Sequence, residues 1–228
     1  MLIPSFIRFL TALCLISGTA TALHAESSFK FNLFEFEGAY VQRVFNFDEA
    51  YTSKYGIPVP TPFSISVPIR SDVKMIADGK PDDGGFAKFT FAVEDQGNLI
   101  LLENIKIVKA TVPIPTDAEN PEAVRIQIAA KLLQEQAFPS AVKGFQSPEI
   151  LALEKYEFDN SRGVQLIGRY VDPSIGPMLL RLTINLNPDH PVSYLTVANM
   201  NLSLVPVSNG DTLRQTITAR VANGLKYK

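Results

Sequence analysis

The sequence has 228 residues, with 21 Lys and Arg against 23 Asp and Glu, and a formal net charge of −2 at pH 7. The charge is nearly balanced and no basic run occurs, which argues against nucleic acid and anionic membrane surfaces as main partners. No phosphate-cradling glycine loop and no dinucleotide fingerprint is present, so we expect no cofactor.

Residues 1–25 have the pattern of a secretory signal peptide, because Arg8 precedes an uncharged run that ends in small side chains. We favour cleavage after Ala25, which makes Glu26 the new terminus, and cleavage after Ala22 also fits the pattern. The apolar run is shorter than the ~20 residues of a spanning helix, so no stable membrane insertion is expected after cleavage. The sequence therefore predicts an exported protein, either periplasmic or secreted.

Cleavage would remove Cys14 and leave His190 as the single histidine. Disulfides, cysteine nucleophiles, cysteine-based zinc sites and two-histidine metal motifs are then excluded. A lipid anchor on Cys14 is disfavoured because Leu13 stands where a lipobox has a small residue. An exported chain without cysteine suits a bacterial periplasm.

Residues 26–80 are expected to form a strand-rich extension with a proline linker. Aromatic side chains crowd its first part, and they are Phe29, Phe31, Phe34, Phe36, Tyr40, Phe45 and Phe47. We interpret them as one or two strands that feed the core, because residues 29–33 alternate as a strand does. The alternative is an aromatic lip that binds a ligand. The prolines between Ile57 and Pro62 form the linker.

Phe63–Met75 reads as an edge strand, because Pro68 cannot donate to a strand ladder. Ile65, Val67 and Ile69 alternate with polar or proline residues along it. We therefore expect these three side chains to mark an edge to which a protein partner can add a strand.

The turn-rich segment 78–85 contains Asp82 and Asp83 side by side. Carboxylates are calcium ligands, but the run lacks the spacing of a calcium loop and its closing Glu. We interpret it as a solvated loop.

Residues 81–228 are predicted to form an α+β core domain. Its antiparallel sheet packs with helices in the order hairpin, helix, four-strand meander, helix. Phe86–Val93 and Leu99–Val108 flank a turn and form the hairpin, and the apolar run that opens the second arm is expected to be buried on both sides. The first helix begins at the N-cap Asn120 and ends at Phe138-Pro139.

Alternation and helical spacing assign the exposed positions. In Met178–Leu186 every even position is apolar, so the polar residues on odd positions, Arg181, Thr183 and Asn185, are expected to face water. Arg125 is expected on the outer face of the first helix. A last helix is predicted to begin at the N-cap Asp211, and its buried stripe comprises Leu213, Ile217, Val221 and Leu225.

Between Phe86 and Lys228 the chain resembles the PsbP-like families, which include DcrB-type exported bacterial lipoproteins and Mog-type binders of nuclear-transport GTPases. The residues that carry the resemblance are the Asn160-Ser-Arg-Gly163 turn, the Gly168-Arg-Tyr170 strand, the Val192–Val197 strand and the terminal helix. The resemblance implies an antiparallel sheet between helices and an accessory or binding protein without shared catalytic residues. The chain departs from these families in lacking a lipobox cysteine and in carrying an additional segment before the hairpin.

Candidate catalytic groups are few. A serine hydrolase would need His190 as its base, but this residue stands in a tight turn and no Gly-x-Ser-x-Gly elbow occurs. Glu35 and Glu37 share one face of a strand, as do Glu154 and Tyr156, and a carboxylate-based hydrolase needs such acidic groups. Charges on the wet face of a strand explain both pairs more simply.

The sequence therefore predicts a non-enzymatic, exported accessory or binding protein of the bacterial envelope, whose partner is another envelope protein. Two alternatives stay open. One is a carrier of an apolar or lipid-like small molecule between sheet and helix. The other is a carboxylate-based hydrolase.

Overall fold

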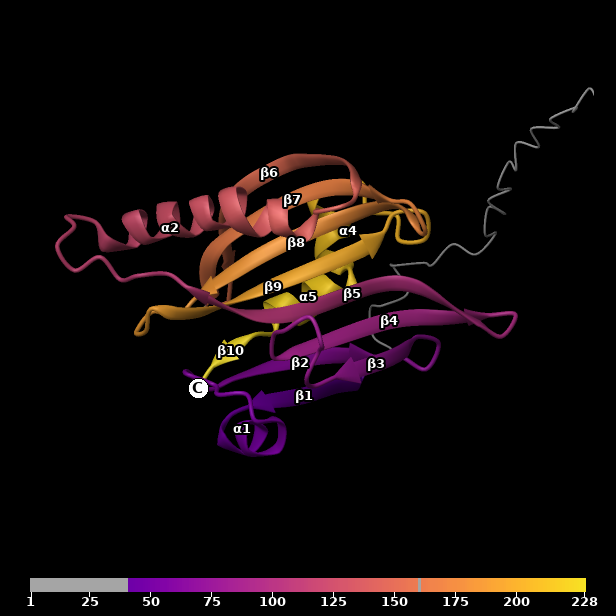
Figure 1. The fold of residues 1–228 in the computed structure, drawn as a ribbon, viewed down its shortest axis with the longest axis horizontal. Helices are drawn as coiled ribbons and strands as arrows, with labels where there is room; N and C mark the ends of the chain where they lie inside the picture. Colours follow the sequence, from indigo (N-terminus) through magenta and orange to yellow (C-terminus); the bar gives the residue numbers. More distant parts are fainter. Residues whose placement is uncertain (1–40, 160) are drawn as a thin grey trace, which may run out of the picture.

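The computed structural model describes residues 41–159 and 161–228. The predicted signal peptide with its cleavage site and the carboxylates Glu35 and Glu37 lie outside these ranges. The described chain forms two antiparallel sheets packed with helices (Figure 1). The α+β class expected from the sequence is confirmed.

The larger sheet has seven strands. In spatial order they are β3 (Lys74–Asp78), β4 (Ala87–Asp95), β5 (Asn98–Thr111), β9 (Val192–Asn201), β8 (Gly176–Leu186), β7 (Ser161–Asp172) and β6 (Gln146–Phe158). The β4–β5 hairpin and the β6–β9 meander follow the predicted order. Since β3 pairs with β4, the sheet also continues across the boundary predicted at residue 80.

The smaller sheet has three strands, and β2 lies in the middle of it. Its strands are β1 (Val41–Phe47), β2 (Phe63–Ile69) and β10 (Lys226–Tyr227), and α1 (Glu49–Tyr55) follows β1. The expectation of an edge strand is therefore wrong. Ile65 and Val67 are fully buried and Ile69 is half-buried, because β1 pairs along one side while β10 and α5 cover the other. Pro68 lies beyond the two residues that pair with β10.

The first helix begins as predicted and runs further than predicted. It comprises α2 (Pro121–Leu132), a π-helical turn (Leu133–Ala137) and α3 (Phe138–Ala141). The side chain of Asn120 caps it by accepting a hydrogen bond from Ala123 N at 3.0 Å. Pro139 does not stop the helix, because it stands at the start of a helical segment, where a missing N–H costs little.

The two faces of the larger sheet are covered differently, as Figure 1 shows. The α2–α3 helix packs on one face, over a cluster built around Leu166, Leu180 and Leu182. The opposite face packs against α5 and the smaller sheet, in a second cluster around Phe63, Ile105 and Tyr194. Residues from the predicted N-terminal extension and from the predicted core domain therefore share one hydrophobic core.

The last helix is divided into two pieces, α4 (Gly210–Gln215) and α5 (Ile217–Asn223). Its N-cap is Asn209 and not the predicted Asp211. Thr216 has an extended backbone, and its hydroxyl accepts a hydrogen bond from Ala219 N at 3.2 Å, so it caps the second piece. The predicted apolar stripe is buried as expected: Leu213, Ile217, Val221 and Leu225.

The polar row of β8 is buried, contrary to expectation. Arg181, Thr183 and Asn185 are at most 3% exposed, because the C-terminal helices and β10 cover this face of the sheet. Arg181 donates to Gln165 Oε1 at 2.9 Å, and the hydroxyl of Tyr227 donates to the carbonyl of Asn185. The alternation along β8 shows which of its two faces is polar. Whether the polar face is exposed to water depends on the elements that pack against it.

Two further expectations about exposure are wrong. Arg125 is buried under α2, where its guanidinium donates to the carbonyl oxygens of Asn187 and His190. In the apolar run that opens β5, Leu99 is exposed and only Leu102 is fully buried, because the β4–β5 hairpin extends beyond the elements that cover it.

Candidate functional site

The short helix α1 begins and ends on clear local signals. Asp48 Oδ1 accepts a hydrogen bond from Ala50 N at 3.1 Å and thereby caps the first turn. Gly56, at φ 71°, ends the helix in the left-handed conformation that glycine adopts without strain. Because only one residue separates α1 from β1, the helix folds back beside that strand.

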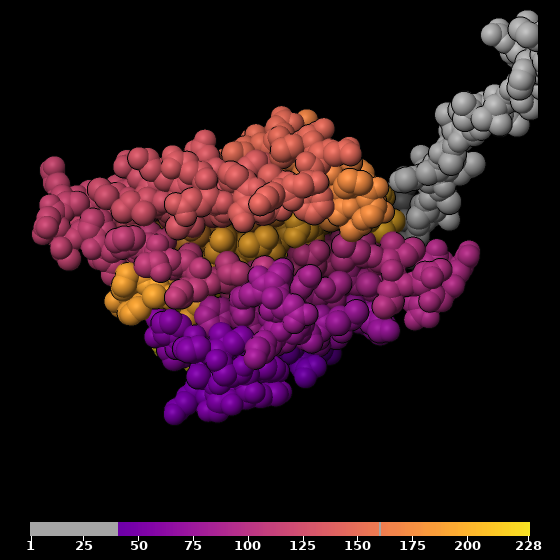
Figure 2. Space-filling view, in the orientation of Figure 1, coloured from indigo at the N-terminus to yellow at the C-terminus, as the bar shows by residue number. Residues whose placement is uncertain are grey.

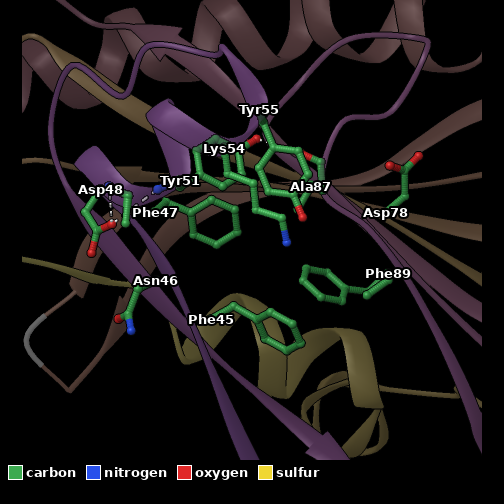
Figure 3. Close-up of a pocket in the computed structure, with 13 residues that line it drawn as sticks. Phe45, Asn46, Phe47, Asp48, Tyr51, Lys54, Tyr55, Asp78, Ala87 and Phe89 are labelled. Carbon is green, nitrogen blue, oxygen red and sulfur yellow. Dashed lines mark hydrogen bonds between the residues drawn. The ribbon is translucent and has the colours of Figure 1, made fainter.

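Between α1, β1 and the β3–β4 hairpin lies a cavity of about 400 Å³, which we name the aromatic pocket (Figure 3). Five rings line it, and they are Phe45 and Phe47 from β1, Tyr51 and Tyr55 from α1, and Phe89 from β4. Ala77 and Ala87 complete its apolar walls. Pockets for small molecules are typically about 300–1,000 Å³ and mostly apolar, and the aromatic pocket meets both criteria.

Ring contacts and one hydroxyl hold the walls in place. Phe47 stacks on Phe63 with 4.4 Å between ring centroids, and Phe45 meets Phe89 edge to face at 4.9 Å. The hydroxyl of Tyr51 donates to the carbonyl oxygens of Gly79, at 2.8 Å, and of Phe86. Burial raises the pKa of Tyr51 to about 12, so this hydroxyl stays a neutral donor. The pocket is pre-formed.

Three charged side chains border the aromatic pocket. The Asp48 carboxylate accepts a hydrogen bond from Lys228 Nζ at 3.1 Å, and this hydrogen bond lowers the pKa of Asp48. Asp78 Oδ1 accepts a hydrogen bond from Lys80 N at 2.9 Å. Lys54 lies with its Nζ 4.9 Å from the centroid of the Tyr55 ring. In Figure 3 the ammonium of Lys54 points into the cavity.

A second cavity, of about 470 Å³, lies on the helix-bearing face of the larger sheet, and we name it the sheet cleft. In Figure 2 residues late in the chain, in gold, form the bottom of a furrow below the α2–α3 helix. Its polar groups bind one another: Tyr170 Oη donates to Asn199 Oδ1 at 2.9 Å, and Asn199 Nδ2 donates to Asn104 Oδ1 at 3.0 Å. Lys106 is paired with Asp83 at 2.8 Å.

β6 is an edge strand of the larger sheet with several exposed apolar side chains. This strand pairs only with β7, and its Ile150, Leu151 and Leu153 are exposed. The pairing register shifts twice along β6, and bulges of this kind are one way in which proteins blunt an edge strand.

The three catalytic candidates that the structure describes, His190, Glu154 and Tyr156, are not assembled into one site. His190 Nδ1 accepts a hydrogen bond from Val192 N at 3.0 Å, which stabilises the turn between β8 and β9. Glu154 is exposed and accepts a hydrogen bond from Gln165. Tyr156 is buried on β6 and donates to Asn223 Oδ1 at 2.7 Å.

Within the described ranges, no three His, Cys, Asp or Glu side chains are grouped so that they could hold a metal ion. In the acidic loop, the Asp83 carboxylate binds Lys106. Among the helices of residues 41–228 that the structure describes, none has the length and apolar character needed to cross a membrane.

The sequence indicates only two of the rings that line the aromatic pocket. For Phe45 and Phe47 the interpretation as a strand that feeds the core is confirmed. Both rings also line the pocket, and ligand binding by them stays a hypothesis. The helix that supplies Tyr51, Lys54 and Tyr55 was missed. Its signals were present in the capping Asp48 and the terminating glycine.

No family model matches the sequence, and no curated protein sequence matches it. Several solved structures align with the structure of this chain. Cyanobacterial PsbP (CyanoP) from Synechocystis sp. PCC 6803 aligns with a TM-score of 0.44 and 11% identity, over 84% of this chain and 96% of that chain. LpqN, involved in cell envelope biogenesis of Mycobacterium tuberculosis, aligns with a TM-score of 0.43 and 12% identity, over 82% and 91%.

The Ran-binding protein Mog1p of Saccharomyces cerevisiae aligns with a TM-score of 0.34 and 10% identity, over 80% of this chain and 89% of that chain. The structural neighbours therefore include PsbP-like proteins of the kind that the sequence resembles. At these identities and TM-scores the similarities assign neither a family nor a function to the chain.

Proposed function

We propose that this protein is an exported, non-enzymatic binding protein that holds a small apolar ligand in the aromatic pocket. The observation that carries the proposal is the pre-formed cavity of about 400 Å³ with five aromatic rings in its walls. Aromatic and apolar walls with a few placed polar groups are the usual composition of a small-molecule site. The signal peptide predicted from the sequence supports a location in the cell envelope.

Pre-organisation supports the choice of this cavity. The Tyr51 hydroxyl is anchored on two carbonyl oxygens, and Phe47 is clamped between Tyr51 and Phe63. A ligand therefore enters a site whose walls are already ordered, and it loses little affinity to the ordering of side chains. Among the described residues, the candidate catalytic groups His190, Glu154 and Tyr156, in contrast, take part in hydrogen bonds within the fold.

The test blocks the pocket without disturbing the core. Ala77 lines the cavity but lies exposed on β3, so Ala77→Trp places an indole in the mouth of the pocket. Ile76 is the next residue on the same strand, points to the opposite face and is 45% exposed, so Ile76→Trp is the matched control.

The measurements are mass spectrometry of small molecules extracted from the purified protein and calorimetric titration with naphthylmethanol, a neutral aromatic probe. Wild type and Ile76→Trp are expected to retain ligand and probe, and Ala77→Trp is expected to lose both. Equal binding by the two tryptophan variants would remove the aromatic pocket as the site.

A second candidate function, the binding of another envelope protein, is favoured by the exposed apolar side chains of β6. An unpaired strand edge offers main-chain hydrogen bonds to an incoming strand, and exposed side chains on it provide contact area. We propose β6 as the strand that binds the partner protein, since β2 is covered on both sides.

A further inference from the structure

The three charged side chains around the aromatic pocket differ in the partners that the protein provides for them. Asp48 is used by the first turn of α1 and by Lys228, and Asp78 accepts from a backbone N–H in its own turn. Among the residues that the structure describes, Lys54 has no carboxylate within ion-pair distance. The pocket therefore presents one ammonium group that the described protein does not neutralise.

The ammonium of Lys54 has a defined position at the pocket. Figure 3 shows the Lys54 side chain crossing the cavity so that its nitrogen faces the rings, while the Asp78 carboxylate points away from it. The contact with the Tyr55 ring, 4.9 Å from nitrogen to centroid, holds the ammonium at the mouth of the pocket.

We infer that the ligand of the aromatic pocket is a small apolar carboxylic acid, whose ring or chain lies among the five rings and whose carboxylate pairs with the ammonium of Lys54. This inference rests on the proposed function. A carboxylate and an ammonium beside apolar walls are less screened than in open water, so their attraction is stronger there.

The other two ligand classes fit less well. A cationic ligand would meet the Lys54 ammonium at the same ring faces, and like charges at that distance repel. Lys54 is exposed, and a neutral ligand at the mouth of the pocket would displace water from its ammonium without offering a negative charge in return, which is unfavourable for a charged group. An acid satisfies the rings and the charge together.

The cavity also limits the size of the acid. A volume of about 400 Å³ is near the lower end of the range for small-molecule sites, so an acid with one or two rings, or a short aliphatic chain, fits it. A diacyl lipid is too large to be enclosed.

The test compares naphthylacetate with naphthylacetamide, which has the same ring and no charge. Affinities are measured by calorimetry on the purified protein and on Lys54→Met, Lys54→Arg and Lys74→Met. Lys74 is an exposed lysine of β3 that does not line the pocket, so its substitution controls for a general loss of positive charge. Lys54→Arg keeps the charge and the contribution that a cation makes at the end of α1.

The wild type is expected to bind the acid about 3- to 5-fold more tightly than the amide, because an ion pair with an exposed ammonium contributes a modest attraction. Lys54→Met is expected to lose this preference while it still binds the amide, and Lys54→Arg and Lys74→Met are expected to keep it. Equal affinity of wild type for acid and amide, or an undiminished preference in Lys54→Met, overturns the inference and leaves the proposed function intact. If neither compound binds wild type, both the inference and the proposed function fall.

Discussion

The carboxylate of Glu103, on β5, caps α5 at Thr218. Its Oε2 accepts hydrogen bonds from Thr218 N at 2.8 Å and from Thr218 Oγ1 at 2.6 Å, and its Oε1 accepts from Ile217 N at 3.1 Å. The side chain is completely buried. A residue in the middle of the larger sheet therefore satisfies the first N–H groups of a helix, where a negative charge is also favoured by the helix dipole.

We predict that Glu103→Ala destabilises the protein by about 2–4 kcal/mol, because two buried N–H groups lose their acceptor. Glu103→Gln keeps one acceptor oxygen and is expected to cost less. Urea unfolding followed by far-UV circular dichroism measures both. A loss below about 1 kcal/mol for the alanine variant would mean that water replaces the carboxylate.

Glu103 also predicts a dependence of stability on pH. Desolvation raises the pKa of this carboxyl above its usual range, against the hydrogen bonds from Thr218 and Ile217. The folded protein thus holds the proton to higher pH than the unfolded chain, whose glutamate pKa is about 4.3. As pH rises above that value, the unfolded chain binds fewer protons than the folded one, and the contribution of Glu103 to stability falls.

The measurement is the free energy of unfolding of wild type minus that of Glu103→Gln as a function of pH. This difference is expected to decrease as pH rises above about 4.3, since the amide does not titrate. A difference that increased with pH would show that the hydrogen bonds outweigh desolvation at this carboxyl.

Local patterns predict the larger sheet well and its coverage poorly. The hairpin arm Phe86–Val93 and the cap at Asn120 each depend on a few consecutive residues, and both form as expected. The burial of Glu103 and Arg181 depends on helices far along the chain, which no local pattern reveals. The central position of β2 likewise depends on β10, at the other end of the protein.

The aromatic pocket was hidden from sequence reasoning for the same reason. Its rings come from three elements, and Phe45 and Phe89 meet only because the smaller sheet packs beside the β3–β4 hairpin. In the sequence Phe45 is one of many aromatic residues near the start of the chain, while Phe89 belongs to an arm of the predicted hairpin. A binding site built from the meeting of separate elements leaves no spacing signature.

Gly163 illustrates a local interpretation that tertiary packing changes. The sequence predicts a turn at Gly163, but this residue lies within β7, where an added Cβ would come 1.8 Å from the carbonyl oxygen of Ile184. Since the obstacle is backbone in a paired strand, we predict that Gly163→Ala destabilises the protein by about 2–3 kcal/mol. Thermal and urea unfolding measure the change.

The matched control is Gly210→Ala at the start of α4. There an added Cβ meets nothing nearer than 3.8 Å, and alanine suits a helix, so the expected change is within about 0.5 kcal/mol. If both substitutions were neutral, β7 and β8 would have to separate easily at Gly163.

Arg125 links α2 to the turn between β8 and β9 through hydrogen bonds. Its guanidinium donates to the carbonyl oxygens of Asn187 and His190 from a buried position, so Arg125→Met leaves two carbonyls without their donor. We expect a loss of about 2–3 kcal/mol and faster amide hydrogen exchange in α2 and in the β8–β9 turn. Lys131→Met, on the exposed side of the same helix, is expected to change neither.

The last prediction concerns β6 and separates the two candidate functions. If a protein partner adds a strand to this edge, Leu153→Lys removes apolar contact and introduces a charge at the interface, and the partner is lost from a pull-down on native envelope extract. Val44→Lys, a change at an exposed apolar residue on the edge strand β1, controls for altered surface charge and is expected to retain the partner. Small-molecule binding in the aromatic pocket is expected to be unaffected by Leu153→Lys, because β6 and β3 lie at opposite edges of the larger sheet. Retention of an identified stoichiometric partner by Leu153→Lys would exclude β6 as the docking edge.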